Sequence, residues 1–205
     1  MKKALLGRKI GMTQFTNEDG TVVPVTACEL GPCVVVQKKN IEKDGYSALK
    51  LGFSDQKEKR VTKPISEDLK KKNITPKRYM AEVDEFDPSI EVGSSLDCTL
   101  FKENDTVNVT GISKGHGFSG VIKRHGFGGG RKTHGSHFHR APGSIGACAY
   151  PSEVWKGKKM PGRFGGSKVT VKNLKIVKIL QDKNIVLISG AIPGRKNTLI
   201  KVTEK

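Results

Sequence analysis

The side chains that could do chemistry are concentrated between residues 114 and 168. This segment holds eleven lysines and arginines and a single acid, Glu153, so it supplies ten of the seventeen net positive charges of the 205-residue chain. It also holds all five histidines. Guanidinium, ammonium and imidazole groups with so few carboxylates beside them are suited to binding phosphate. The segment therefore predicts binding to a polyanion.

Aromatic residues and glycines in the same segment favour RNA as that polyanion. Widely spaced rings that cannot meet in a core can stack on bases, and the segment places Phe118, Phe127, Phe138, Trp155 and Phe164 in this way. Its fourteen glycines oppose a helix or a sheet interior. Strand-like sequence flanks it at residues 107–112 and 169–180. We therefore expect one long extended basic arm, residues 114–168, that binds folded RNA.

Two glycine motifs in the arm suggest nucleotide binding, but their context disagrees. Gly115 to Gly120 matches GxGxxG, yet no apolar-periodic helix follows and the next acid is thirty-three residues on, too far for a ribose-binding acid. The sequence of residues 126–133 is similar to a phosphate-binding loop motif, in which a glycine directly precedes the lysine. Here Arg131 occupies the position of that glycine. No nucleotide cofactor is expected.

Metal binding and catalysis have little support. His134, His137 and His139, with Cys148 nearby, are possible zinc ligands, but no pair of closely spaced cysteines accompanies them. No nucleophile, base and orienting acid stand together in a local motif. We expect no enzyme activity, metal, cofactor or small-molecule substrate. Two alternatives stay open: an RNA-modifying or nucleotide-dependent enzyme that uses the glycine motifs, and a free regulatory RNA-binding module.

The remaining composition favours a cytoplasmic protein. A net charge of +17 and an isoelectric point near 9.8 predict attraction to polyanions, with nucleic acid ahead of an anionic membrane surface. No window approaches 18 apolar residues, and Arg8 and Lys9 interrupt the apolar start of the chain, so neither a membrane span nor an export signal is expected. Four scattered cysteines predict reduced thiols. We do not expect homo-oligomers.

The elements that must carry the arm are mostly strands. Alternating apolar residues predict strands over 5–15, 21–30, 33–39 and 46–53, then 106–112, 169–180, 185–189 and 199–202 after the middle region. Short antiparallel strands separated by turns predict a small closed β-barrel built from residues 1–54 and 105–205. Residues 55–104 predict a small α+β insertion, with a helix capped by Ser66, a strand over 80–86 and a turn at 87–88.

Six stretches of the chain resemble a known family. They are KALLGRKIGMTQ (3–14), VTGISKGHGF (109–118), VIKRHGF (121–127), THGSHFHRAPGSIG (133–146), VWKGKKMPG (154–162) and GAIPG (190–194). Together they are similar to the bacterial form of the third protein of the large ribosomal subunit. The resemblance covers nearly the whole chain, and residues 55–104 match only loosely.

The resemblance implies a structural constituent of the 50S subunit. Its barrel would be of the translation-factor type and would bind 23S rRNA near the 3′ end, beside neighbouring ribosomal proteins, while its arm would run towards the peptidyl transferase centre and support early assembly. Residues 133–140 would line the deeply buried stretch, and Ala147, Cys148 and Ala149 would form the tip. Some family members carry a methylated glutamine near that tip; Ala149 matches this position, so no methylation is expected.

Residue type and motif together give a set of predicted rRNA-binding residues. Two lie near the N-terminus and the others lie in the arm: Arg8, Lys9, Lys114, His116, Lys123, Arg124, His125, Arg131, Lys132, His134, His137, His139, Arg140, Trp155, Lys156, Lys158, Lys159, Arg163 and Lys168.

Overall fold

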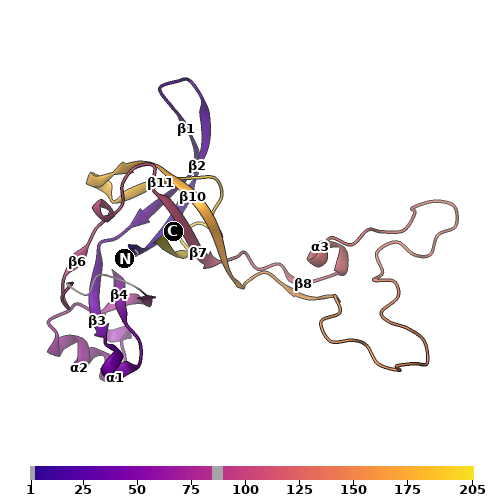
Figure 1. Cartoon of the computed structure of the whole chain (residues 1–205), viewed down its shortest axis with the longest axis horizontal. Helices are drawn as coiled ribbons and strands as arrows, with labels where there is room; N and C mark the ends of the chain where they lie inside the picture. Colours follow the sequence, from indigo (N-terminus) through magenta and orange to yellow (C-terminus); the bar gives the residue numbers. More distant parts are fainter. Residues whose placement is uncertain (1–2, 85–89) are drawn as a thin grey trace. The chain divides into compact units, whose positions relative to one another are not determined.

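The computed structural model describes residues 3–84 and 90–205 of the chain (Figure 1). The chain divides into two compact units. We call Met1–Ser113 together with Lys168–Lys205 the barrel unit, and Lys114–Ser167 the basic unit.

Six antiparallel strands of the barrel unit close into a barrel, as the alternating pattern predicts. In barrel order they are β1 (Ala4–Thr16), β12 (Leu199–Glu204), β7 (Thr106–Ile112), β10 (Lys168–Leu180), β11 (Ile185–Ser189) and β2 (Val22–Leu30). One face of each strand points inward, and Val107, Val109, Ile200 and Val202 are almost wholly buried there. Closure leaves no open sheet edge along the paired part of these strands.

A second sheet holds two strands that we expected in the barrel region. Strands β3 (Cys33–Lys39) and β4 (Ala48–Asp55) pair with each other, and β5 (Lys77–Asp84) and β6 (Ser95–Leu96) complete the order β5-β4-β3-β6. The chain leaves the barrel at Gly31, whose φ is +75°, and Pro32, which cannot donate a ladder hydrogen bond. Alternation alone does not say which partner a strand chooses, so the sequence did not separate the two sheets.

The two sheets of the barrel unit share one hydrophobic core. Leu5 and Ile176 from the barrel belong to the same buried cluster as Val35, Leu51 and Val83 from the second sheet. Burial of this apolar surface is the main stabilising contribution to the unit.

Short helices connect these strands. They are α1 (Ile41–Asp44), α2 (Lys63–Lys71) and the 3₁₀ turns Glu58–Arg60, Cys98–Leu100 and Gln181–Lys183. The expected cap at Ser66 is wrong: α2 begins at Lys63 after Thr62, because Pro64 has a backbone angle suited to the first helical turn. The expected strand over 80–86 is found as far as Asp84, and the rest of it and the turn at 87–88 lie outside the described residues.

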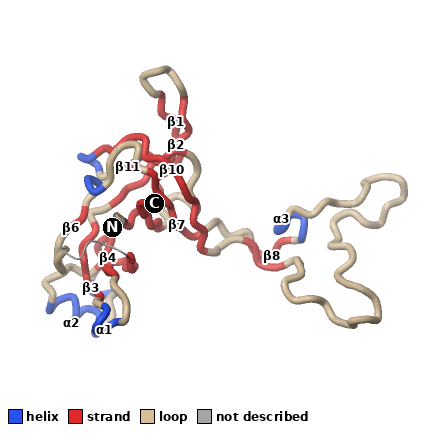
Figure 2. The backbone as a smooth tube through the Cα atoms, in the orientation of Figure 1, coloured by secondary structure: helices blue, strands red, loops and turns tan. Residues whose placement is uncertain are grey.

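The basic unit has little regular structure of its own. Strands β8 (Gly117–Ser119) and β9 (Gly162–Phe164) pair with each other, and α3 (Val121–His125) follows β8. The path from α3 to β9 is drawn as loop in Figure 2. In the part of the chain that the structure describes, no helix is long and apolar enough to cross a bilayer.

Candidate nucleic-acid interface

The two ends of the basic unit are fastened to each other by backbone and ring contacts. The N–H of His116 donates to the carbonyl oxygen of Phe164 at 2.9 Å, beside the β8–β9 pairing. The imidazole of His116 also stacks on the ring of Phe164, with 5.0 Å between centroids. His116, a predicted rRNA-binding residue, therefore also holds the outgoing and returning chain together.

A second fastening joins α3 to the returning chain. The guanidinium of Arg124 donates to the carbonyl oxygen of Met160 at 2.8 Å, and a ring nitrogen of His125 lies 3.0 Å from the same oxygen. Gly162 lies so close to the Arg124 guanidinium that a Cβ atom would overlap it. The helix can end here because Gly126 adopts the left-handed conformation, with φ of +70°. Arg124 and His125, which their charge predicts to bind rRNA, thus also make contacts within the basic unit.

A third close approach shapes the loop that carries three histidines. The N–H of Gly130 donates to the carbonyl oxygen of His139 at 3.2 Å. A Cβ atom on Gly130 would overlap the carbonyl oxygen of Phe138, so this crossing requires glycine. The loop that it closes exposes most of its side chains to solvent, and these include Arg131, Lys132, His134, His137 and His139. Arg140, which follows the loop, is exposed as well.

Several large apolar side chains of the basic unit are exposed, whereas Val121 is buried and Phe127 and Phe164 are half-buried. Phe118 is 80% exposed, Trp155 71% and Tyr150 90%. Tyr150 was not among the predicted aromatic residues, although it stands in the same polar surroundings as Trp155. An open pocket of about 500 Å³ is lined by Ile145, Ala147 and Trp155 together with Lys156 and Lys158. Such a surface offers flat apolar faces beside cations, which suits unpaired bases and their phosphates.

No cation of the basic unit forms an ion pair with a carboxylate of the described residues. Every ion pair that residues 3–84 and 90–205 form uses a cation at or before Lys77: Lys3, Arg8, Lys39, Lys72 and Lys77. Ten lysines and arginines lie between residues 114 and 167, and none of them is within an ion-pairing distance of a described acid. Glu153, the single acid of this unit, pairs with none of them. The positive charge is therefore uncompensated within the described chain.

The two predicted residues near the N-terminus differ from those of the basic unit. Arg8 is exposed, and its Nε lies 2.6 Å from a carboxylate oxygen of Glu29. Lys9 is only 9% exposed, and its ammonium group donates to the carbonyl oxygen of Ile192 at 2.9 Å. This geometry does not support an rRNA contact for Lys9, because the ammonium group is used inside the barrel unit. Lys168 is exposed at the start of β10.

Further cations on the barrel unit were missed by the sequence analysis. They are exposed and belong to no ion pair of the described chain: Lys172, Lys175 and Lys178 on β10, and Arg195 and Lys196 between β11 and β12. The recurrence of lysine every three residues along β10 is the sequence signal for these cations.

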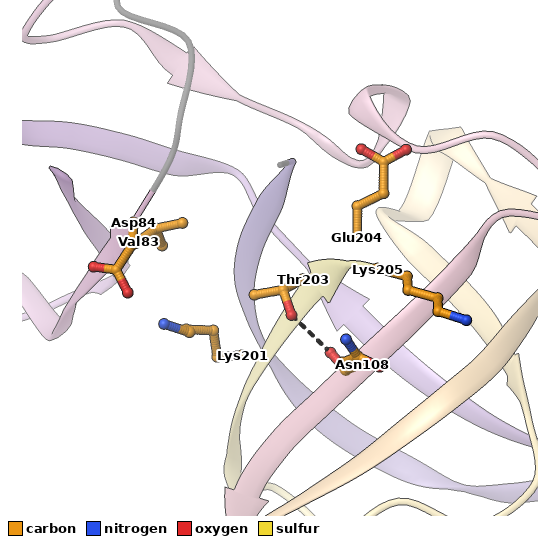
Figure 3. Close-up of a pocket in the computed structure, with 7 residues that line it drawn as sticks. All are labelled: Val83, Asp84, Asn108, Lys201, Thr203, Glu204 and Lys205. Atoms are coloured by element: carbon orange, nitrogen blue, oxygen red, sulfur yellow. Dashed lines mark hydrogen bonds between the residues drawn. The ribbon is translucent and has the colours of Figure 1, made fainter. Parts of the chain in front are cut away.

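The barrel unit also has a polar pocket, which shows no catalytic arrangement (Figure 3). It has a volume of about 240 Å³ and is lined by Val83, Asp84, Asn108, Lys201, Thr203, Glu204 and Lys205. The hydroxyl of Thr203 donates to the carbonyl oxygen of Asn108, and the ammonium of Lys201 donates to that of Glu82. The carboxylates of Asp84 and Glu204 point in different directions. No three histidine, cysteine or acidic side chains gather as a metal site among residues 3–84 and 90–205.

The buried thiols belong to the core. Burial raises the pKa of Cys28 to about 12 and that of Cys33 to about 11. A thiol that stays protonated at neutral pH is a poor nucleophile and a poor metal ligand. These two cysteines therefore contribute packing.

Comparison with known families assigns the chain. Residues 81–185, just over half of the protein, match the family described as Ribosomal protein L3. The match includes the whole basic unit and the two strands, β7 and β10, between which that unit is inserted. This is a family of structural ribosomal proteins and not of enzymes. The chain therefore belongs to the ribosomal protein L3 family, the rRNA-binding proteins of the large ribosomal subunit that take part in translation.

Proposed function

We propose that the basic unit is an extended arm that enters folded rRNA, and that the protein organises this RNA without doing chemistry on it. The observation that carries the proposal is the set of ten lysines and arginines between residues 114 and 167 that no described carboxylate neutralises. Like charges at this density repel one another. An anionic environment that surrounds the segment removes this repulsion, and closely packed RNA helices provide one.

The backbone of the basic unit supports the same role. Three glycine-dependent approaches hold the chain against itself at Gly129, Gly130 and Gly165, where a Cβ atom would overlap a backbone carbonyl oxygen. These non-covalent contacts limit the conformations of the free basic unit, so less conformational entropy is lost when it binds RNA. A partly preorganised loop can therefore present cations and rings to RNA at a smaller ordering cost than a free tail.

The chemistry of the RNA contact follows from the exposed side chains. Lysine and arginine neutralise phosphates and release their counterions, while Trp155, Phe118 and Tyr150 offer faces for unpaired bases. Ala147, Cys148 and Ala149 are small and exposed. Small side chains at the tip of an arm let RNA approach the backbone closely.

The finer assignment is part of the same proposal. The protein is a bacterial-type member of the family, works in the cytoplasm and binds 23S rRNA near its 3′ end. The basic unit reaches towards the peptidyl transferase centre, with residues 147–149 nearest to it, and the protein supports early assembly of the subunit.

Deletion of residues 116–165 tests the role of the basic unit. Ile112 and Lys168 are directly paired across β7 and β10, so a short turn can join these strands once the unit is removed. We expect the shortened protein to fold and to bind 23S rRNA with a shallower salt dependence. The slope of log K against log salt should fall by about 0.7 to 0.9 for each lost phosphate contact. An unchanged slope would refute the proposal.

Sedimentation separates this function from that of a free RNA-binding module. A structural component should travel with the large subunit through a sucrose gradient at high salt. Recovery of the protein only in the free fractions would favour the regulatory alternative.

A further inference from the structure

The outer part of the hairpin formed by β1 and β2 has a composition opposite to that of the rest of the chain. Residues 10–37 contain no lysine or arginine, although the chain has 37 in its 205 residues. The same stretch contains Glu18 and Asp19, which are exposed and lie in the turn, and Glu29. A surface that is to meet phosphate needs cations, so the outer part of the hairpin, beyond Arg8 and Lys9, is poorly suited to RNA.

The end of the hairpin continues past the closed barrel. Strand β12 pairs with β1 only as far as Arg8, and β11 pairs with β2 only from Val25 onwards. Residues 14–16 and 22–24 therefore form a two-stranded ribbon, visible beyond the other strands of the barrel in Figure 1. At residues 11–13, β1 pairs with β2 on one side, and no described strand pairs with its other edge. An isolated two-stranded ribbon is marginally stable, and its outer edges present backbone groups that can pair with another strand.

The two faces of this ribbon are covered differently. Phe15 and Val23 pair across the strands and are half-buried, and the ammonium of Lys178 lies 5.7 Å from the centroid of the Phe15 ring. The opposite face is open: Met12 is 55% exposed and Val22 59%. Met12 on the open edge of β1 and Val22 on the ribbon therefore expose apolar side chains on one face of the hairpin, where a partner can bury them.

We infer that the open face and edge of the β1–β2 hairpin bind a lysine- and arginine-rich segment of another protein of the large subunit. Met12 and Val22 supply the apolar contact, the ribbon edge supplies backbone hydrogen bonds, and Glu18 and Asp19 select positive charge. The basic unit of this chain is an example of a segment with such a composition. RNA is the competing partner, and the acids at the turn disfavour it.

Photocrosslinking in purified large subunits tests this inference with the full-length chain. Met12 is replaced by p-benzoylphenylalanine, the protein is incorporated in cells, and isolated subunits are irradiated. We expect an adduct that survives ribonuclease and that mass spectrometry maps to a lysine- and arginine-rich segment of another protein. An adduct lost on ribonuclease treatment, an adduct to a segment without excess positive charge, a dimer of this chain, or the absence of any adduct overturns the inference.

Charge reversal at the turn tests the selectivity. In the same photoprobe protein, E18K/D19K should lower the yield of the protein adduct several-fold. The matched variant E58K/E67K changes the net charge equally on exposed residues away from the hairpin and should leave the yield unchanged. Equal losses in both variants overturn the assigned role of the acids. Where E18K/D19K does not enter subunits, E18Q/D19N replaces it, and a smaller loss is expected.

A probe at Trp155 keeps this result separate from the proposed function. The same photoreactive residue at Trp155 should give an adduct that ribonuclease removes. If Trp155 crosslinks to rRNA while Met12 finds no protein, only the hairpin inference fails.

Discussion

The ammonium group of Lys9 donates to the carbonyl oxygen of Ile192 at 2.9 Å and ties β1 to the loop between β11 and β12. It also lies 3.5 Å from the carbonyl oxygen of Gly194. Two backbone hydrogen bonds join the same segments: the N–H of Asn197 donates to the carbonyl oxygen of Lys9, and the N–H of Lys9 donates to the carbonyl oxygen of Thr198. The Lys9 ammonium group therefore stabilises the barrel unit, because it holds in place the loop that carries Arg195 and Lys196.

Replacing Lys9 with methionine should destabilise the barrel unit. Methionine is close to lysine in length but has no donor, so buried carbonyl oxygens lose a charge-assisted partner. The loss should be about 1 to 3 kcal/mol in the free energy of unfolding, measured by urea denaturation. R8M is the control: Arg8 forms a partly exposed ion pair with Glu29, worth about 0 to 1 kcal/mol. Equal losses in the two variants would contradict the structural role of Lys9.

Lys9 also shows what the sequence could and could not predict. The closed barrel was predictable because inward and outward residues alternate along its strands. By the same alternation, Lys9 follows Leu5 and Gly7 on the buried side of β1, but the prediction relied on its charge. The assignment of β3 and β4 to a second sheet was not predictable, because strand pairing depends on contacts between residues far apart in sequence.

The basic unit shows a similar division. Its composition indicated an RNA-binding role, and the family match agrees with that role. The internal bonds of Arg124 and His125 to Met160 could not be read from the sequence, since they join residues about 35 positions apart through a loop without periodicity. Residue type therefore indicated that the basic unit binds RNA. It did not indicate that Arg124 and His125 are already bonded within the unit.

Replacing Gly130 with alanine should open the histidine-bearing loop. A Cβ atom at this position would overlap the Phe138 carbonyl oxygen, so the Gly130–His139 hydrogen bond must break. We expect faster tryptic cleavage after Arg131 and Lys132, by roughly tenfold for each 1.4 kcal/mol lost. G128A is the matched control, because nothing lies within 4 Å of a Cβ atom there. Identical cleavage rates for the two variants would show that the crossing does not hold the loop.

Replacing Trp155 with alanine should weaken rRNA binding without changing the stability of the barrel. The ring is 71% exposed, so truncation removes little packing. Loss of base stacking should reduce the binding free energy by about 1 to 3 kcal/mol, measured at fixed salt. W155F keeps an aromatic face and should retain most of the affinity. If W155A binds as wild type does, stacking at this position is excluded.

Stability should fall at alkaline pH because of the buried thiols. Burial raises the pKa of Cys28 from 9.0 to about 12, and that of Cys33 from 9.0 to about 11. Between pH 9 and 11 the unfolded chain loses these protons and the folded chain keeps them, so rising pH favours unfolding. Each thiol should contribute a slope of about 1.4 kcal/mol per pH unit. C28A should remove one such contribution from a series of urea titrations, whereas C148A, which removes an exposed thiol, should leave the slope as in wild type. A C28A slope equal to that of wild type would mean that Cys28 ionises as readily in the folded protein as in the unfolded chain.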